Sequence, residues 1–452
     1  MFNRTIIAEL RIWADKPDRK PLILRGARQV GKTTAVDMFS REFENYIRLN
    51  LELKNDLELF QQNLDLKDLI DYILLKKNIT LKPGRTLIFI DEIQNSPEAI
   101  SLLRFFHETA HQFYVIAAGS LLEIIMAKHE ISFPVGRVEY RFMYPLTFQE
   151  FLGAMDQHEV LKYYSIIPCP DIAVKRIQEL FMQYTMIGGM PEIINTYITN
   201  QTISGLSILY QSLMTSFQDD VKKYARRSEA IAIIRHAIES APLEAGNRIK
   251  FQGFGKSNYR SREMGEALRN LQRAMLIYLV YPVTSEKPPA LPDKKKSPRL
   301  QFLDTGLLNF AAGLQAMFYE KEDLHSIYQG KLAEHITAQE IIASDLQSQS
   351  ICHFWVKEKK QSNAEVDFII QYREKFIPVE VKAGSTGTLR SLHQFMDRVD
   401  HNYAVRLYSG ELRIESTRTT EGKKFTLLNL PYCFAGKLNE YIDWFIGNIQ
   451  SQ

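Results

Sequence analysis

The chain has 452 residues, of which 45% are hydrophobic and 24% charged, and its formal net charge is +3. This length predicts about two to four domains of an ordinary globular protein, and no run approaches the roughly 18 apolar residues of a membrane span or forms a signal peptide. The three cysteines, Cys169, Cys352 and Cys433, are far apart and form no C-x-x-C pair, which argues against a disulfide framework or zinc site and favours the cytoplasm.

The first motif of the chain is a phosphate-binding loop. A short amphipathic helix (residues 4–14) and an apolar strand (21–24) precede it, and amphipathic residues 34–43 predict a helix after it. The loop reads G-x-x-x-x-G-K-[ST], in which glycines let successive N–H groups face the α- and β-phosphates of ATP. Lys32 reaches the β- and γ-phosphates, and the Thr33 hydroxyl takes a position on Mg²⁺. The predicted ATP-binding residues of the loop are Gly26, Ala27, Arg28, Gln29, Val30, Gly31, Lys32, Thr33 and Thr34.

The second motif is a buried strand that ends in two carboxylates. Residues 44–51 predict the second strand, and helix-prone residues 55–77 separate it from the apolar run 85–90. Asp91 and Glu92 follow that run directly, at the sheet edge where α/β folds bind ligands. Asp91 is predicted to hold Mg²⁺ through water, and Glu92 to polarise the attacking water. The alternative is an acidic pair that only caps the next helix.

Two polar residues further along are candidates for contacting the γ-phosphate. Residues 112–118 predict the next strand, after which Ser120 is expected between the two motifs; its alternative role is a helix N-cap. Arg137 precedes the segment 144–151 and is a candidate for neutralising transition-state charge, in cis or from a neighbouring subunit. A surface ion pair is the alternative for Arg137.

Four stretches carry a resemblance to a known family. They are RGARQVGKTT (residues 25–34), LIFIDEIQN (87–95), AAGSLLE (117–123) and GRxxxRxxxPLTFxEF (136–151). Together they resemble a group of bacterial and archaeal AAA-type P-loop ATPases, which is similar to the STAND-like and archaeal ATPases. The resemblance implies ATP hydrolysis with ATP and Mg²⁺ bound, and it implies a nuclease-like C-terminal region.

Residues 151–225 are expected to form a helical lid. Their apolar spacing is helical and their glycines are few, apart from a break at residues 188–192, where Pro191 suits the first position of a new helix. Packing on the ATPase core is the simplest role for such a segment.

The next segment has the pattern of a winged helix. Residues 228–240 and 257–275 predict helices, and strands at 276–282 and 299–303 flank a lysine-rich loop. Residues 222–299 hold 17 Lys and Arg against 7 Asp and Glu, a net charge of +10, which leaves −7 for the rest of the chain. This charge favours DNA as a partner, with the second helix in a major groove and the hairpin on phosphates. The alternative is a spacer whose arginines are solvated.

A second set of charged residues lies near the C-terminus. Glu334 falls on a predicted helix, and two strands that are expected to pair as a hairpin carry Asp367, Glu380 and Lys382. The three carboxylates suit a second Mg²⁺ or a Mn²⁺, and Lys382 is placed to orient or deprotonate a water. The set resembles the PD-(D/E)XK nuclease signature, although Val366 stands where that signature has a proline. The alternatives are an inactive nuclease fold and surface charges on a hairpin.

The sequence therefore predicts an α/β protein of four parts. These are a P-loop ATPase domain with a parallel sheet (residues 1–150), a helical lid (151–225), a winged-helix domain (226–320) and a restriction-endonuclease-like α/β domain (321–452). One hypothesis is a Mg²⁺-dependent ATPase that associates with DNA through residues 222–299. The other is a nucleotide-switched signalling or scaffold ATPase whose nuclease-like domain is inactive. Either is compatible with a homo-oligomer, and neither involves a membrane.

Overall fold

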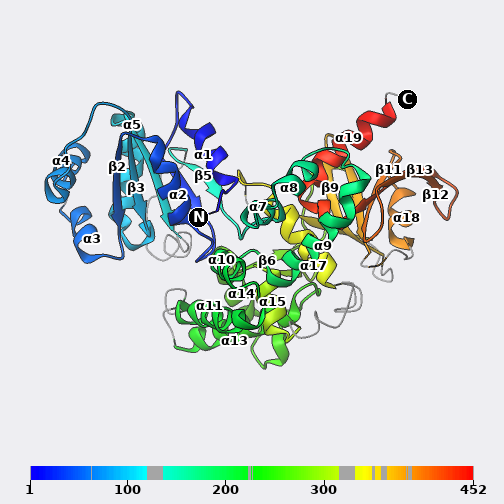
Figure 1. Ribbon diagram of the computed structural model, residues 1–452. Coiled ribbons are helices and arrows are strands. Elements are labelled where there is room, and N and C mark those ends of the chain that lie inside the picture. Colours follow the sequence, from blue (N-terminus) through cyan, green and yellow to red (C-terminus); the bar gives the residue numbers. More distant parts are fainter. Residues whose placement is uncertain are drawn as a thin grey trace. The chain divides into compact units, whose positions relative to one another are not determined.

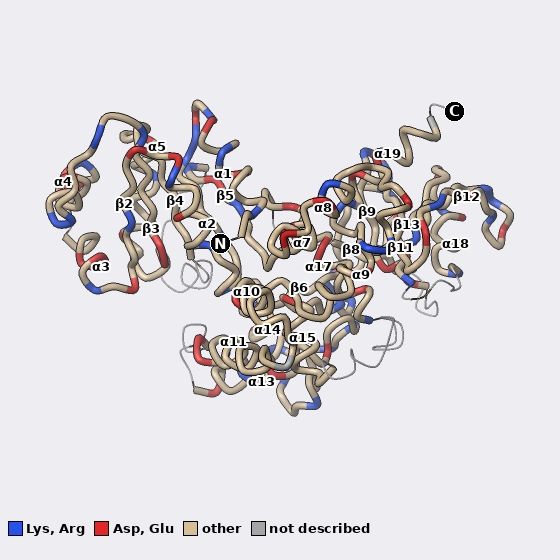
Figure 2. The backbone as a smooth tube through the Cα atoms, viewed as in Figure 1, with Lys and Arg blue, Asp and Glu red and all other residues tan. Residues whose placement is uncertain are grey.

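Two units, each built around its own sheet, make up the described part of the chain (Figure 1). In the computed structural model, the described residues are 2–62, 64–119, 136–221, 225, 228–314, 331–348, 352–357, 364–382, 384 and 389–450. The first unit comprises Met1–Tyr144 with the segments Arg273–Met275 and Asp345–Gln349; the second comprises Pro145–Gln272, Leu276–Ser344 and Ser350–Gln452. Acidic and basic residues are interspersed along the backbone of both units (Figure 2).

The first unit is a parallel α/β fold, as predicted. Its strands are β1 (Leu22–Arg25), β2 (Asn45–Asn50), β3 (Thr86–Asp91), β4 (Phe113–Gly119) and β5 (Glu139–Phe142). Its helices are α1 (Ile6–Ala14), α2 (Lys32–Phe39), α3 (Lys54–Phe60), α4 (Leu66–Lys77) and α5 (Pro97–Thr109), with short 3-10 turns η1 (Ser40–Glu42) and η2 (Ile93–Asn95). The strands lie in the order β2-β3-β4-β1-β5, and all neighbours are parallel. The carboxyl ends of β1, β3 and β4 therefore share one edge of the sheet.

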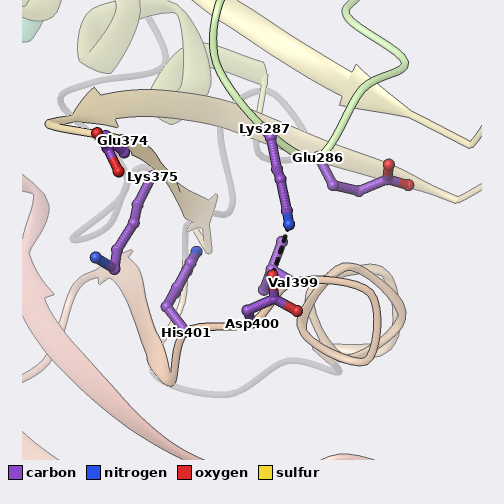
Figure 3. Close-up of a pocket in the computed structure, with 7 residues that line it drawn as sticks. All are labelled: Glu286, Lys287, Glu374, Lys375, Val399, Asp400 and His401. Atoms are coloured by element: carbon purple, nitrogen blue, oxygen red, sulfur yellow. Dashed lines mark hydrogen bonds and ion pairs between the residues drawn. The ribbon is translucent and has the colours of Figure 1, made fainter.

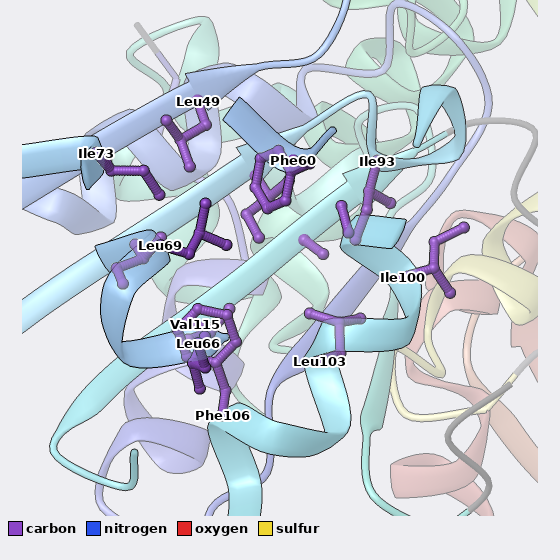
Figure 4. Packing of buried hydrophobic residues seen from close by; sticks show 14 of the residues in the cluster. Leu49, Phe60, Leu66, Leu69, Ile73, Ile93, Ile100, Leu103, Phe106 and Val115 are labelled. Atoms are coloured by element: carbon purple, nitrogen blue, oxygen red, sulfur yellow. The ribbon is translucent and has the colours of Figure 1, made fainter. Parts of the chain in front are cut away.

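Apolar side chains fill the space between this sheet and helices α3, α4 and α5 (Figure 4). Leu49 and Val115 of the strands pack in one cluster with Phe60, Leu69 and Leu103 of the helices. Burial of each such side chain stabilises the fold by roughly 1.5–3 kcal/mol. β3 is buried along its whole length, which agrees with its uninterrupted apolar sequence. This core supports the sheet whose edge carries the phosphate loop and Asp91.

The second unit begins with helices and ends with α19, shown in red in Figure 1. Its helices are α7 (Phe148–Ala154), α8 (His158–Tyr164), α9 (Asp171–Ile187), α10 (Pro191–Asn200), α11 (Ser207–Asp219), α13 (Ser228–Glu244), α14 (Ser261–Arg273), α15 (Thr305–Ala311), α17 (Lys331–Ala343), α18 (Arg390–Met396) and α19 (Leu438–Gln450), with 3-10 turns η3 (Ser204–Leu206), η4 (Phe254–Lys256) and η6 (Tyr432–Lys437). Its strands are β6 (Ile277–Val280), β7 (Arg299–Phe302), β8 (His353–Val356), β9 (Glu365–Tyr372), β10 (Lys375–Val381), β11 (Tyr403–Tyr408), β12 (Arg413–Arg418) and β13 (Lys424–Pro431).

The strands of the second unit form one hairpin and one mixed sheet. β6 and β7 are antiparallel, and the other strands lie in the order β12-β13-β11-β10-β9-β8. β9 and β10 pair antiparallel, as predicted, with Tyr372 opposite Lys375 and Phe368 opposite Val379. β10, β11 and β13 run parallel, flanked by antiparallel neighbours. The predicted order of helix, helix and hairpin is present in α13, α14, β6 and β7, whereas a winged helix and a restriction-endonuclease-like domain stay predictions.

A buried carboxylate fixes the break between α9 and α10. α9 ends at Ile187 and α10 begins at Pro191, where the sequence predicts the break. Asp304 is fully buried and accepts hydrogen bonds from the backbone N–H groups of Gly189 at 2.6 Å and Leu307 at 3.1 Å. Its carboxylate thereby caps the N-terminus of α15. It also accepts the hydrogen bond of a backbone N–H group in the turn between α9 and α10, which would otherwise be buried without a partner.

The first boundary between the two units along the chain lies between Tyr144 and Pro145. The domain boundaries predicted near residues 150, 225 and 320 stay predictions. Within the described residues, no helix is both long and apolar enough to cross a lipid bilayer.

Candidate functional site

The phosphate loop connects β1 to α2 through backbone that requires glycine. A Cβ at Gly26 would lie 2.3 Å from the carbonyl oxygen of Met143, so a larger residue does not fit. Gln29 and Gly31 have positive φ angles of 65° and 94°, and Gly31 is the N-cap of α2. The N–H groups in the first turn of a helix have no acceptor within it. They are therefore available to an anion at this end of α2.

Lys32 is buried within the loop. Its Nζ donates to the carbonyl oxygens of Gly26 at 3.0 Å and Ala27 at 2.8 Å. Burial lowers the pKa of Lys32 to about 8, while the carboxylates of Glu92 and Asp91 act in the opposite direction. The carbonyl oxygens hold the ammonium group without neutralising it, which leaves its charge available to phosphate oxygens.

Asp91 ends β3 and faces the first turn of α2. Thr33 Oγ1 donates to Asp91 Oδ2 at 2.8 Å, and an Nη atom of Arg48 lies 3.7 Å from the same oxygen. Burial raises the pKa of Asp91, whereas the hydrogen bond from Thr33 and the charge of Arg48 lower it. A hydroxyl and a carboxylate are the hard oxygen donors that Mg²⁺ prefers. Thr33 and Asp91 therefore fit the predicted metal position.

Glu92 leaves the strand in an unusual backbone conformation. Its φ is 53°, in the left-handed region that non-glycine residues seldom adopt. Gln94 is 2% exposed, and its Nε2 donates to Oε2 of Glu92. A Cβ at Gly119, the last residue of β4, would lie 2.2 Å from Oε1 of Gln94, so glycine leaves room for this amide. Gln94 therefore orients the carboxylate of Glu92.

Gln94 and Arg4 belong to this candidate site, although the sequence analysis gave neither of them a role. Arg4 donates to the carbonyl oxygens of Val30 at 2.9 Å and Tyr144 at 2.7 Å, and so it fastens the phosphate loop. Gln94 could have been found from the sequence, because it is a polar residue only two positions after Glu92. No local pattern indicates Arg4, because its partners lie 26 and 140 residues away in sequence.

The structure describes two of the three remaining candidates of the first unit, Arg28 and Arg137. Ser120 lies outside the described residues. Arg28 pairs with Glu52 at 4.0 Å. Arg137 Nε lies 3.2 Å from Glu108 Oε1, and the Arg137 side chain is 51% exposed. The surface ion pair named as the alternative is thus present, and a role for Arg137 at a phosphate stays a prediction.

The predicted residues of the C-terminal site lie on neighbouring elements: Glu334 on α17, Asp367 on β9 and Glu380 on β10. Lys382 Nζ donates to Glu380 Oε1 at 2.7 Å, and Asp367 Oδ2 accepts from the backbone N–H of Val381 at 2.9 Å. Burial and the charge of Asp367 raise the pKa of both Glu334 and Glu380. The β9–β10 hairpin and α17 therefore place Glu334, Asp367 and Glu380 close enough for the charge of one carboxylate to raise the pKa of another.

Arg299 is the residue of this cluster that sequence reasoning missed. It was counted with the basic segment 222–299, yet its guanidinium pairs inside the protein with Glu334 at 3.4 Å and Asp367 at 3.6 Å. Among the described residues, no group of three or more His, Cys, Asp and Glu side chains is arranged to hold a metal ion. Metal binding by Glu334, Asp367 and Glu380 therefore stays a prediction.

A separate cavity of about 280 Å³ lies in the second unit (Figure 3). Lys287 Nζ lies 2.6 Å from Asp400 Oδ2, and Nε2 of His401 lies 2.9 Å from the carbonyl oxygen of Phe376. Burial lowers the pKa of His401 to about 4, so this imidazole is neutral at pH 7. The cavity is lined by side chains of both charges and one valine: Glu286, Lys287, Glu374, Lys375, Val399, Asp400 and His401. This mixture does not select one class of ligand.

Comparison with protein families divides the chain into three segments. Residues 18–152 match the AAA domain family. Residues 178–317 and 329–431 match two domains of unknown function, DUF8612 and DUF4143. A search of curated proteins found no match to the chain.

Among solved structures, the chain is similar to a Walker-type ATPase of Pyrococcus abyssi, with 14% identity and a TM-score of 0.44 over 69% of this chain and 96% of that one. It is also similar to ORC1 of Aeropyrum pernix in complex with DNA (11% identity, TM-score 0.27, 68% and 90% covered) and to PCH-2 of C. elegans (11%, 0.28, 43% and 59%). TM-scores this low carry no functional argument. Residues 18–152 therefore match an AAA domain, and the parallel sheet and the loop geometry of the first unit fit a P-loop NTPase fold.

Proposed function

We propose that the protein binds ATP with Mg²⁺ at the edge of the first sheet and hydrolyses the ATP. The observation that carries this proposal is the 2.8 Å contact between Thr33 on α2 and Asp91 on β3, beside the buried Lys32. The loop N–H groups and Lys32 would bind phosphate oxygens, and Thr33 and Asp91 would hold Mg²⁺. Bound Mg²⁺ neutralises charge on the β- and γ-phosphates. Glu92 would accept a proton from the attacking water.

Nucleotide binding and phosphate release by the full chain test this function. The wild type is expected to release phosphate from ATP when Mg²⁺ is present, and Lys32→Ala is expected to lose both ATP binding and turnover. Lys54→Ala is the matched control, because Lys54 lies on α3 with its side chain 87% exposed. Binding and turnover that are unchanged in Lys32→Ala would overturn the assignment.

Gln94→Met is expected to lower the maximal rate of ATP hydrolysis by about 10–100-fold, because Glu92 loses the donor that orients it. Gly119→Ala is expected to have the same effect, since its methyl group displaces the Gln94 amide. Gln94 acts through Glu92, so the affinity for ADP should not change in either variant. Steady-state phosphate release and ADP titration measure the two quantities. A normal kcat in both variants contradicts this positioning role.

Lys32 makes nucleotide binding depend on pH above neutrality. Its pKa is about 8 in the nucleotide-free protein, and bound phosphates raise it because they stabilise the ammonium form. Binding therefore takes up a proton above pH 8, and affinity is expected to fall by up to about tenfold for each further pH unit. Calorimetry of ADP binding in two buffers of different ionisation enthalpy measures this uptake. Heats that are buffer-dependent at about pH 9 and not at about pH 7 are expected; buffer-independent heats at both would contradict it.

We also propose that the basic part of the second unit contacts DNA. Arg262 and Arg269 are exposed on α14, opposite the buried Met264. Lys294 and Lys295 are exposed in the loop that joins β6 to β7. Exposed cations on a helix and an adjoining hairpin support phosphate contacts.

Anisotropy of a labelled DNA duplex at several salt concentrations tests this contact. Affinity is expected to fall steeply with salt, and each of Arg262→Ser and Arg269→Ser should reduce the slope of log K against log salt by about 1. Exchange of the buried Met264 for leucine serves as the control for altered packing of α14. Failure of the wild type to bind DNA at low salt would overturn the proposal.

The ion pairs of Arg299 favour a second candidate, a nucleotide-switched scaffold whose nuclease-like region does not cleave. A plasmid cleavage assay with Mg²⁺ or Mn²⁺, with and without ATP, separates this candidate from an ATP-coupled nuclease. Cleavage that is lost in Asp367→Ala supports the nuclease. Intact ATP hydrolysis without cleavage supports the scaffold.

A further inference from the structure

Arg299 lies at the centre of the carboxylate cluster in the second unit. It is the first residue of β7, and its side chain is 12% exposed. Nη1 lies 3.4 Å from Oε2 of Glu334, and Nη2 lies 3.6 Å from Oδ1 of Asp367. Nη2 also pairs with Oε1 of Glu365. One nearly buried cation thus faces three carboxylates that come from α17 and β9.

Further contacts hold the guanidinium of Arg299 in one orientation. Its Cζ lies 4.8 Å from the ring centre of Phe354 on β8, so the ring covers one face of the group. Nη1 donates to the backbone carbonyl oxygen of Asp367 at 3.4 Å. Arg248 pairs with the other oxygen of Glu365 at 3.5 Å. A planar group with donors in fixed directions suits several carboxylate acceptors at once.

A divalent ion and Arg299 compete for the same position. Mg²⁺ requires oxygens at about 2.0–2.1 Å in a near-octahedral arrangement and usually keeps several waters. The cavity lined in part by Arg299, Glu334 and Asp367 measures about 10 Å³, the space of roughly one water. A metal bound to these carboxylates would also meet the fixed positive charge of the guanidinium.

Glu380 is the other predicted metal ligand, and the charge of its carboxylate is balanced by Lys382 and not by Arg299. Its Oε1 accepts a hydrogen bond from Lys382, while its Oε2 has no partner among the described residues. The residue is 6% exposed, so this oxygen is also shielded from water. A buried carboxylate oxygen without a donor favours a nearby cation, which makes Glu380 a ready additional ligand once space is created.

We propose that Arg299 is the built-in cation of the cluster formed by Glu334, Glu365 and Asp367, and that this cluster binds a divalent metal only when the charge of Arg299 is removed. The region keeps the carboxylates of a metal site but holds an arginine in place of the metal. Because β7 lies within residues 178–317 and β9 within residues 329–431, the same ion pairs join the two segments of unknown function. The proposal does not depend on ATP hydrolysis in the first unit.

Mn²⁺ binding to the full chain, followed by electron paramagnetic resonance, tests this proposal. Asp91→Asn serves as the parent protein, so that the ATP site contributes no Mn²⁺ signal. Addition of Arg299→Met, which keeps length without charge, is expected to create a Mn²⁺ site that the parent lacks and to make the melting temperature rise with Mn²⁺. Arg299→Lys, which keeps the charge, should behave as the parent, and adding Asp367→Asn to Arg299→Met should abolish the new site.

Either of two results would overturn the proposal. The first is Mn²⁺ binding in the parent protein that disappears in Asp367→Asn. The second is a folded Arg299→Met protein that gains no Mn²⁺ site. If Arg299→Met folds only with Mn²⁺, the metal replaces the missing charge, as proposed.

A further variant decides the case in which Arg299→Met does not fold even with Mn²⁺. Adding Glu334→Gln and Asp367→Asn removes the uncompensated charge and should restore folding; continued failure to fold contradicts charge compensation. ATP hydrolysis measured with Arg299→Met alone should equal that of the wild type. A negative result for the metal cluster is therefore distinguishable from a negative result for ATP hydrolysis.

Discussion

The Glu92→Gln protein is expected to bind ATP normally and to hydrolyse it about 10²–10⁴-fold more slowly than the wild type. The amide has the size of the carboxylate but cannot accept a proton from water. The contacts that hold the rest of the site do not involve Glu92: Lys32 is fixed by loop carbonyl oxygens, and Thr33 is bonded to Asp91. Binding and chemistry should therefore separate in this variant.

Single-turnover phosphate release and equilibrium binding of ATP measure the two effects. Glu58→Gln is the matched control, because Glu58 lies on α3 of the same unit with its side chain 49% exposed. This control should keep full activity. If Glu92→Gln hydrolysed ATP at the wild-type rate, Glu92 would have no part in activating the attacking water.

Gly306→Ala is expected to destabilise the second unit by about 2–4 kcal/mol. A Cβ at Gly306 would lie 1.9 Å from the carbonyl oxygen of Ile187, at the end of α9. That oxygen cannot easily yield, since it accepts a hydrogen bond from the Tyr210 hydroxyl at 2.7 Å. The next turn is held by Asp304 through Gly189. Relief of the clash therefore requires α15 and α9 to separate.

Gly153→Ala separates this close contact from the general effect of replacing glycine. Gly153 lies within α7, and a Cβ there would meet its nearest neighbour, a methyl carbon of Leu161, at 4.0 Å. Because alanine is the better helix former, this variant should be stabilised by about 0.5–1 kcal/mol. Urea-induced unfolding gives both changes as shifts of the midpoint. Equal midpoints for Gly306→Ala and the wild type would show that α15 moves freely.

Local sequence patterns determined much of the candidate nucleotide site. The spacing of Gly26, Gly31 and Lys32 and the apolar run before Asp91 are properties of consecutive residues. They therefore predicted the loop, the strand β3 and a helix after the loop without any knowledge of packing; that helix was expected at residues 34–43 and runs from Lys32 to Phe39. The same reason accounts for the break before Pro191 and for the β9–β10 hairpin, since proline and short turns act on neighbouring backbone.

Only the tertiary structure decided the contacts between residues that are far apart in the chain. Strand order brings Gly119 beside Gln94, and folding of the second unit brings Arg299 to Asp367, which is 68 residues away. In sequence, Arg299 is one more cation of a basic segment; in the structure, its guanidinium pairs with the carboxylates of Glu334, Glu365 and Asp367. Helical and strand periods encode which face a residue occupies, but they do not encode which distant residue meets it there.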